Sequence, residues 1–523
     1  MLVNMQKKNL VLNKCSINEN ISDWIEQDII VPDSKPDAVK IVNVTVTPYV
    51  TDCEVMDGKV KVMGKLNYFV IYRVNDEGFC NRGLFMSYPY SEVLTLENAR
   101  SGMNMIIDPK CKNIIFSLPN ERKIAVKSEI MFKVKVKEQV NAYVIKNFDC
   151  DMPIECKMCN KTFNNIIQNK SSVIASKEDV MLPKEAEDFF EILKIEAKIK
   201  NTEYKESYNK IMVKGDIDVK IIYLTENSTE DVKRVSIDVP FSAMVELGNI
   251  SDKSKFDIKY IIQDFSIKLN PDITTTKTLT TEYQIMVDVT MYEEDEVEYV
   301  EDFYSQNREL KYEEETVEAV SKTVTFTNNI DIKENITNIL PANSNLLDYS
   351  LDTSYITPKI TNNMVELEGN AKVSLLLQDR ETMELDNKII DVLVNQKYDV
   401  DGISEISNAY VEITGDNIEV TQNGTDIEVR ISLQIYTNIE DLINLNLIDS
   451  IEDNILDISN LDSINIYVVK AGDTLWNIAE EQQNQNSYYK DKEIREIIND
   501  IKKVNKLKSS NLSVGQEIKI PTI

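Results

Sequence analysis

One pattern of 13 residues occurs three times in this sequence: VKVMGKLNYFVIY (60–72), IMVKGDIDVKIIY (211–223) and VELEGNAKVSLLL (365–377). Each copy carries glycine at its fifth position, at Gly64, Gly215 and Gly369. Around the glycine, apolar residues alternate with mostly polar ones. Alternation with a period of two predicts a β-strand with one buried face, and a glycine within such a strand indicates a bulge or a close backbone approach.

The copies agree beyond this strand. Pro89-Tyr90-Ser91 lies 25 residues after Gly64, and Pro240-Phe241-Ser242 lies 25 residues after Gly215. The glycines are 151 and 154 residues apart, whereas solenoid repeats have periods of about 20 to 50 residues. The pattern therefore predicts whole-domain duplication, with three unrelated β-domains as the alternative. We expect three antiparallel β-rich domains that fold as separate units, at residues 25–145, 165–305 and 315–440.

Two acidic stretches lie near the expected boundaries. Residues 293–302 and residues 440–462 each hold seven carboxylates and no basic residue. Neither shows the residue order of a calcium loop, so we interpret both as solvated connectors. The sequence then divides into an N-terminal segment (1–24), the three β-domains, an acidic linker (441–462) and a C-terminal module (463–523).

Composition excludes several functional classes. The chain has 523 residues, a formal net charge of −30 and no histidine. Such an acidic surface repels phosphate backbones and anionic lipids, so we expect neither nucleic acid nor a membrane as partner. Without histidine, Ser-His-Asp catalysis and His-ligated zinc are excluded. The first residues have no apolar run long enough for a signal peptide, and no stretch is long enough to span a membrane, so we expect a soluble chain made in a cytosol.

The C-terminal module differs from the rest of the chain. From residue 463 onward it holds nine basic and eight acidic residues, so its net charge is +1 while the other residues carry −31. Ile466 and Val468 alternate in a predicted strand, a turn follows, and Asp473 or Thr474 caps a predicted helix. A second helix over residues 494–504 and a strand over 517–521 complete a βααβ pattern.

This module resembles the LysM domain. The residues that carry the resemblance are Tyr467, Val469, Gly472, Asp473, Thr474, Leu475, Ile478, Ala479, Asn505, Leu507, Leu512, Val514, Gly515, Gln516, Ile518, Ile520 and Pro521. LysM domains bind N-acetylglucosamine polymers between two loops. The resemblance therefore implies a binding site for a glycan or a protein partner at Gly472, Asp473, Thr474, Leu475, Ser510, Asn511 and Leu512. A polar insertion around residues 482–486 lengthens the span between the helices and favours a protein ligand. We expect Trp476 to pack against the module.

The repeated β-domains with a C-terminal LysM domain resemble the clostridial spore-coat morphogenetic proteins that contain SPOCS domains. This resemblance rests mainly on the V-x-V-x-G strand. It implies a mother-cell protein at the forespore surface, recruited by a coat ATPase like stage IV sporulation protein A, with other coat proteins or a second copy as further partners. The alternative function is binding of peptidoglycan in the cell wall or cortex.

The remaining motifs give little support for an enzyme. Gly58 to Leu66 reads GKVKVMGKL, which has five residues between its glycines and no Ser or Thr after the lysine, so it is not a P-loop. Cys156 and Cys159 form one CxxC, and zinc sites need four ligands. No carboxylate pair is marked for catalysis, so a wall hydrolase is the weakest alternative. We expect no catalytic residue, no metal and no cofactor.

Overall fold

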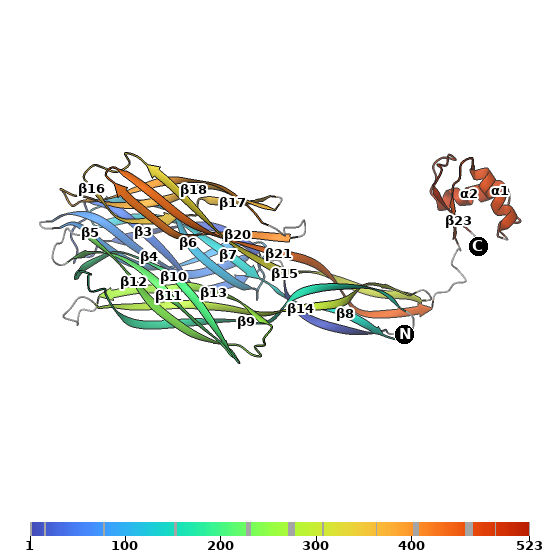
Figure 1. The fold of residues 1–523 in the computed structure, drawn as a ribbon, viewed down its shortest axis with the longest axis horizontal. Helices are drawn as coiled ribbons and strands as arrows, with labels where there is room; N and C mark the ends of the chain where they lie inside the picture. Colours follow the sequence, from blue (N-terminus) through green and yellow to red (C-terminus); the bar gives the residue numbers. More distant parts are fainter. Residues whose placement is uncertain are drawn as a thin grey trace.

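The computed structural model describes residues 3–14, 17–76, 79–150, 154–225, 232–269, 278–305, 308–361, 363–400, 407–455, 464–486 and 488–521. The described chain is mainly β, and its two helices lie near the C-terminus (Figure 1). This confirms the predicted fold class.

The first repeat forms a sandwich of two antiparallel three-stranded sheets, β3-β4-β5 and β2-β7-β6. Its strands are β2 (Ile17–Ile30), β3 (Lys40–Met56), β4 (Lys59–Asp76), β5 (Phe79–Thr95), β6 (Asn104–Asn120) and β7 (Lys123–Lys137). The alternating apolar side chains of β4 and β7 face each other in one core, which includes Val62, Tyr68, Ile130 and Phe132. We call this sandwich domain 1.

The second and third repeats form sandwiches with corresponding sheets, which we call domains 2 and 3. Domain 2 contains β9 (Glu155–Met181), β10 (Phe189–Ser207), β11 (Lys210–Thr225), β12 (Val232–Glu246), β13 (Ser254–Leu269) and β14 (Thr278–Tyr304). Domain 3 contains β15 (Arg308–Ile336), β16 (Ser344–Asp352), β17 (Ile356–Thr361), β18 (Met364–Asp379), β19 (Leu385–Asp399), β20 (Ser407–Asn423) and β21 (Asp426–Ile455). In domain 3 the first strand of the repeat is split, because β16 and β17 both pair with the same edge of β18.

The repeated glycine has a packing reason. Gly64 pairs with Tyr90 across β4 and β5, and Gly215 pairs with Phe241 in the same register across β11 and β12. The ring atoms of Tyr90 and Phe241 lie 2.9 and 2.8 Å from the point where a Cβ on the facing glycine would stand. The Pro-aromatic-Ser motif 25 residues after each glycine therefore supplies the ring that covers it.

A methyl group at Gly64 should destabilise the protein strongly. A Cβ there would stand 1.9 Å from the backbone oxygen of Tyr49, so the strand has to move. We expect Gly64→Ala to lower the free energy of unfolding by about 3 kcal/mol, the upper range for an overpacked core. Urea titration followed by circular dichroism measures this. In Gly248→Ala, the matched control, the nearest atom to the new Cβ is 3.8 Å away. A loss in Gly64→Ala no larger than in the control would show that the glycine is not required by packing.

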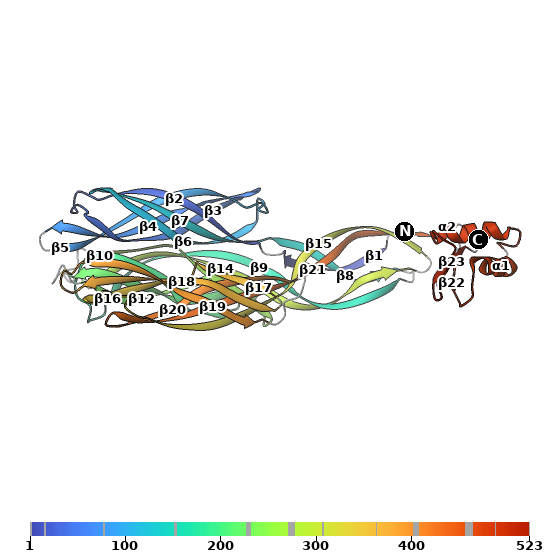
Figure 2. The same cartoon turned by 90° about the horizontal axis from the view of Figure 1, so that it is seen from above.

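The three domains pack side by side and share apolar side chains (Figures 1 and 2). Ile71, Ile222 and Leu376 each lie seven residues after the repeated glycine, and all three belong to one buried cluster between the domains. Its other buried members are Val42, Leu193, Leu224, Val232 and Leu385. We call this group the apex cluster. Separate folding units were expected, but each domain buries some of its apolar side chains against the neighbouring domains.

Each pair of domains is also joined by polar contacts. Arg82 of domain 1 forms an ion pair of 2.9 Å with Glu191 of domain 2. Arg73 of domain 1 donates to the backbone oxygen of Leu385 in domain 3 over 2.9 Å. Domains 2 and 3 meet where Nζ of Lys194 lies 3.3 Å from the carboxylate of Asp348. The three sandwiches therefore form a closed ring of contacts.

Three two-stranded ribbons extend from one end of this ring (Figures 1 and 2). One ribbon pairs β1 (Asn4–Asn13) with β8 (Gln139–Asp149), and the others are the outer parts of β9 with β14 and of β15 with β21. Side chains from all three ribbons form a buried cluster that includes Leu12, Phe163, Val297 and Leu445. We call this three-ribbon structure the stalk.

The stalk differs from the expected connectors. Residues 293–302 continue β14, and residues 441–455 continue β21, whereas an acidic connector and an acidic linker were expected there. The N-terminal segment 1–24 likewise contributes β1 and the start of β2. In β14, Val297 and Tyr299 alternate with carboxylates and turn into the stalk core, so the acidic side chains occupy the outer face. The rest of the expected linker, residues 456–463, lies outside the described residues.

Candidate functional site

The C-terminal module is a small α+β unit with its own core. It consists of β22 (Ile464–Val468), α1 (Leu475–Gln485), α2 (Ile494–Val504) and β23 (Glu517–Pro521). The two strands pair in antiparallel fashion and the helices pack on one face, as predicted. Tyr467 in β22 and Val469, directly after the strand, face the core, while Ile466 and Val468 are 64% and 50% exposed. In both views the module lies beyond the stalk end of the molecule (Figures 1 and 2).

The turn before α1 is held by the side chain of Asp473. Its Oδ2 accepts hydrogen bonds from the backbone N–H of Lys470 at 2.7 Å and from the hydroxyl of Tyr467 at 3.0 Å. Burial raises the pKa of the Tyr467 hydroxyl, and the bond to Asp473 raises it further. Gly472 has a φ of +94°, a conformation that glycine adopts at little cost. Asp473 thus fixes the shape of the turn, and its Oδ2 is already occupied.

Thr474 and Leu475 also have structural roles. The Thr474 hydroxyl caps α1 by accepting a hydrogen bond of 3.2 Å from the backbone N–H of Asn477, and Leu475 is buried in the module core. Trp476 was expected to pack, yet its side chain is 47% exposed. The exposed part of this predicted binding loop is therefore Gly472, the backbone of the turn and the neighbouring indole.

Removing the cap should destabilise only the module. We expect Thr474→Ala to lower its stability by about 1 kcal/mol, because a backbone N–H at the start of α1 loses its acceptor. Thermal unfolding of the full chain with Trp24→Phe, in which Trp476 is the sole tryptophan, reports this change through tryptophan fluorescence. Thr474→Ser keeps a capping hydroxyl and should retain most of the stability. Equal losses in the two variants would contradict a capping role.

The second predicted loop lies directly beside the first. The backbone N–H of Gly515 donates to the oxygen of Val469 over 2.8 Å, and the N–H of Val469 donates to the oxygen of Gln516 over 2.9 Å. Asn511 is exposed, whereas Leu512 is half-buried against the same core as Leu475. These bonds join the residue that follows β22 to the turn that precedes β23, so the two predicted loops start and end at neighbouring points of the module.

Ser510 and Asn505 define the rest of this loop. The Ser510 hydroxyl accepts a hydrogen bond of 2.9 Å from Nζ of Lys502 in α2. The side-chain amide of Asn505 bonds both the N–H and the oxygen of Lys519, at 2.7 and 2.6 Å, and so joins the end of α2 to β23. The loop is anchored at both ends, which leaves residues 508–511 exposed between them.

The insertion between the helices contributes to the core rather than to the loops. Gln482 to Gln485 form the last turn of α1, and Tyr489 is completely buried. Gln483 donates to the backbone oxygen of Lys492 over 2.7 Å, which holds the connection against the helix. Sequence reasoning missed Tyr489, because the motif positions flank the insertion and none lies within it.

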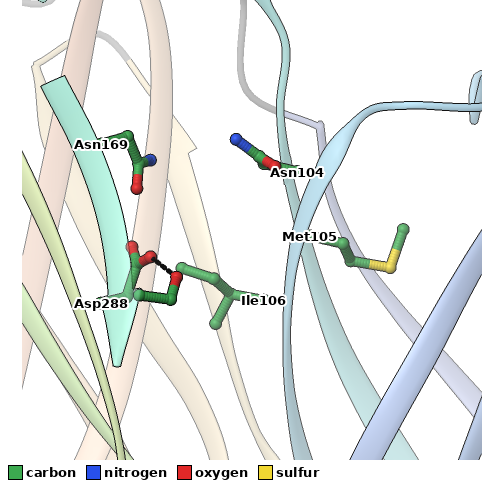
Figure 3. Close-up of a pocket in the computed structure, with 6 residues that line it drawn as sticks. Asn104, Met105, Ile106, Asn169 and Asp288 are labelled. Carbon is green, nitrogen blue, oxygen red and sulfur yellow. Dashed lines mark hydrogen bonds between the residues drawn. The ribbon is translucent and has the colours of Figure 1, made fainter. Parts of the chain in front are cut away.

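The sandwiches contain a polar cavity of about 220 Å³ between domains 1 and 2 (Figure 3). It is lined by Asn104, Met105, Ile106, Asn169, Ser171 and Asp288. Asp288 is buried and accepts a hydrogen bond of 2.6 Å from the Ser171 hydroxyl, a neutral donor. The lining offers amide, hydroxyl and carboxylate oxygens, and Asp288 is its one carboxylate.

The CxxC and the P-loop-like segment both lie in strands. Cys156 and Cys159 are part of β9 and pair with Phe303 and Tyr299 of β14. Burial raises the pKa of the Cys156 thiol, which disfavours the thiolate that binds metal. No cluster of His, Cys, Asp or Glu suited to a metal ion is present in the part of the chain that the structure describes.

Family models match both parts of the molecule. The model described as SipL, SPOCS domain matches residues 37–118 and 188–270, which contain β3 to most of β6 and β10 to β13. The LysM domain model matches residues 467–521. No curated protein and no solved structure matched the chain. Among the described helices, none is long and apolar enough to cross a membrane.

Both models describe binding domains, and their positions agree with the fold. The two SPOCS matches start at equivalent strands of domains 1 and 2, and domain 3 repeats the same sheet pairing. The LysM match covers the βααβ module and both of its loops. The chain therefore combines SPOCS domains with a C-terminal LysM domain, which is the domain content of a SPOCS/LysM sporulation protein.

Proposed function

We propose that this chain is a non-enzymatic spore-coat assembly protein. In this proposal the LysM module binds a coat scaffold ATPase like stage IV sporulation protein A, and this recruits the chain to the forespore surface within the mother cell. The SPOCS domains add contacts to other coat proteins or to a second copy. The combination of a SPOCS match with a C-terminal LysM match supports a role in sporulation.

The exposed apolar side chains of the module support a protein as its partner. Four apolar side chains near the two loops are exposed: Val514 by 70%, Ile466 by 64%, Val468 by 50% and Trp476 by 47%. Ile466 and Val468 share the outer face of β22, and Val514 directly precedes Gly515, which bonds to the end of that strand. Clustered apolar side chains on a small soluble domain are typical of a protein interface.

The second candidate is binding of peptidoglycan. The paired loops at Gly472 and Asn511, with the exposed indole of Trp476 beside the first loop, favour it. Backbone N–H groups at the start of α1 can donate to the amide groups of N-acetylglucosamine. A glycan reader would need these loops, whereas it would not need the apolar outer face of β22.

Capture experiments with Val514→Glu separate the two functions. We expect the full chain to be retained by immobilised scaffold ATPase, and Val514→Glu to weaken this binding at least about fivefold, the effect of about 1 kcal/mol at an interface. The matched control is Val93→Glu, which places the same charge on a side chain of domain 1 that is 54% exposed. Biolayer interferometry measures both affinities.

Soluble N-acetylglucosamine oligomers provide the opposing test. They should not displace the chain from the scaffold protein, and purified cell wall should retain the chain poorly. If the oligomers bind and displace the partner, and the wall retains the chain, the module acts as a glycan reader. If Val514→Glu and Val93→Glu bind the scaffold equally well, the apolar face is not the interface.

A further inference from the structure

Two cysteines lie together at the outer end of the stalk. Cys150 directly follows β8, and Cys156 is the second residue of β9, so they stand on either side of the connection between these strands. Both side chains are half-buried and pack against the same apolar cluster. Its buried members are Val3, Ile145, Val300, Ile448 and Ile451. We call this group the tip cluster.

Two aromatic rings show how the segments that carry these cysteines meet. Phe303 is paired with Cys156 across β9 and β14, and Phe148 lies two residues before Cys150. The ring centroids of Phe148 and Phe303 are 4.9 Å apart. Since paired residues and residues two apart in extended chain share a face, each cysteine lies beside one ring of this pair. The pKa of the Cys156 thiol is raised first by burial and then by Cys150, which agrees with this proximity.

The other cysteines that the structure describes are not placed to react with these two. Cys156 and Cys159 are three residues apart in one strand, so their Cα atoms are separated by about 10 Å, whereas a disulfide needs about 4.4–6.8 Å. Cys159 packs against the stalk core instead. Cys53 and Cys111 pack against the core of domain 1. The CxxC motif therefore does not mark the reactive pair.

We propose that Cys150 and Cys156 form a disulfide bond when the protein meets a peroxide. One thiolate attacks a peroxide oxygen and becomes a sulfenic acid, while the O–O bond breaks and the leaving hydroxide takes up a proton to form water. The second thiol attacks the sulfenic sulfur, the S–O bond breaks, and a second water leaves. Two thiols and one hydrogen peroxide thus yield one disulfide and two waters, because the sulfurs give up the two electrons that the peroxide accepts.

This bond would join two ribbons of the stalk covalently. β8 pairs with β1 and β9 pairs with β14, so side-chain packing alone holds these ribbons together at the tip cluster. A disulfide restricts the unfolded chain and therefore stabilises the folded one. The raised pKa of Cys156 keeps its thiol protonated, so the reaction is slow and needs an oxidising environment. Only the source of that oxidant, outside the cytosol at a spore surface, rests on the proposed function.

Peroxide treatment of the purified full chain tests this proposal. The remaining thiols are then alkylated in denaturant, and a glutamate-specific protease and trypsin cleave after Glu155 and Lys157, which separates Cys150, Cys156 and Cys159 unless a disulfide joins them. We expect mass spectrometry to find Cys150 joined to Cys156. We also expect the Tm to rise by about 3 °C on oxidation. Dithiothreitol should reverse both changes.

Cys156→Ser should lose the joined peptides and the rise in Tm, whereas the matched control Cys159→Ser should keep both. If Cys156→Ser does not fold, Cys150→Ser takes its place and should show the same losses. The proposal is wrong if Cys156 is joined to Cys159, if the link forms between two chains, or if peroxide leaves Cys150 and Cys156 open to alkylation. Joined peptides without a rise in Tm contradict the stabilising role. Because neither scaffold protein nor cell wall is used, these failures leave the proposed function untouched.

Discussion

A chain that ends after residue 462 should fail almost completely to reach the forespore surface. The module carries the paired loops and the exposed apolar side chains, and it has a core of its own. The remaining body has a net charge of −31, which opposes non-specific adhesion to anionic surfaces. Fluorescence microscopy of sporulating cells that produce the tagged full chain or the truncated chain measures the localised fraction.

This result supports recruitment through the module only if residues 1–462 remain folded without it. The stalk and the sandwiches contain their own buried clusters, so the truncated chain should show the same β-sheet circular dichroism and a similar Tm. Val93→Glu in the full chain controls for a change of surface charge. Normal localisation of a folded, truncated chain would mean that the SPOCS domains carry the recruitment.

Lys194→Met should cause one of the largest losses of stability that a single substitution can produce here. The Nζ of Lys194 lies 2.6 Å from Glu196 and 3.3 Å from Asp348, and Arg234 also contacts Asp348 at 3.5 Å. The side chains of Lys194 and Asp348 keep only 7% and 6% of their surface exposed. Removing the ammonium leaves a buried carboxylate short of a partner, which costs about 3–5 kcal/mol. Urea titration of the full chain measures the loss.

The pH dependence of this loss has a defined sign. Burial opposes the charge of Lys194, but Glu196 and Asp348 outweigh it and raise its pKa above 10.5, so its contribution persists until strongly alkaline pH. For Glu196, burial opposes ionisation while Lys194 lowers the pKa below 4.5. Its contribution is therefore present above pH 4.5 and disappears as the pH falls through the lowered pKa. The difference between wild type and Lys194→Met should be constant near neutrality and shrink in acid.

Lys214→Met is the control for this variant. Nζ of Lys214 lies 2.9 Å from Glu203, but both side chains are more than half exposed, so solvent screens the pair. Its loss of stability should be much smaller than that of Lys194→Met. Equal effects of Lys194→Met and Lys214→Met would show that the contact between domains 2 and 3 does not depend on the buried charges.

The sequence predicted the elements whose signal is local. Alternation around Gly64, Gly215 and Gly369 predicted the central strands, and the motif around Gly472 predicted the module, because one chain segment specifies each of them. The stalk was missed, since carboxylates outnumber the inward residues such as Val297 and Leu445. The acidic composition of these segments predicted connectors, although their apolar residues alternate as in a strand.

The remaining features depend on contacts between distant segments. Lys194 and Asp348 are 154 residues apart, and nothing near either residue marks the pair. In the module, the sequence motif placed Asp473, Thr474 and Leu475 in one loop, but it could not show that all three side chains stabilise that loop.

The stalk also makes the molecule a spacer of defined length. At about 3.3 Å per residue, the 29 residues of β15 can extend roughly 95 Å, so a single strand runs from the sandwich of domain 3 through the stalk. The two ends of a flexible linker can approach each other, whereas three ribbons that share a buried core resist compression and bending. Two partners held at opposite ends would be kept apart at a fixed distance. Shortening paired strands equally would then change the thickness of any layer built on this protein, without altering the chemistry at either end.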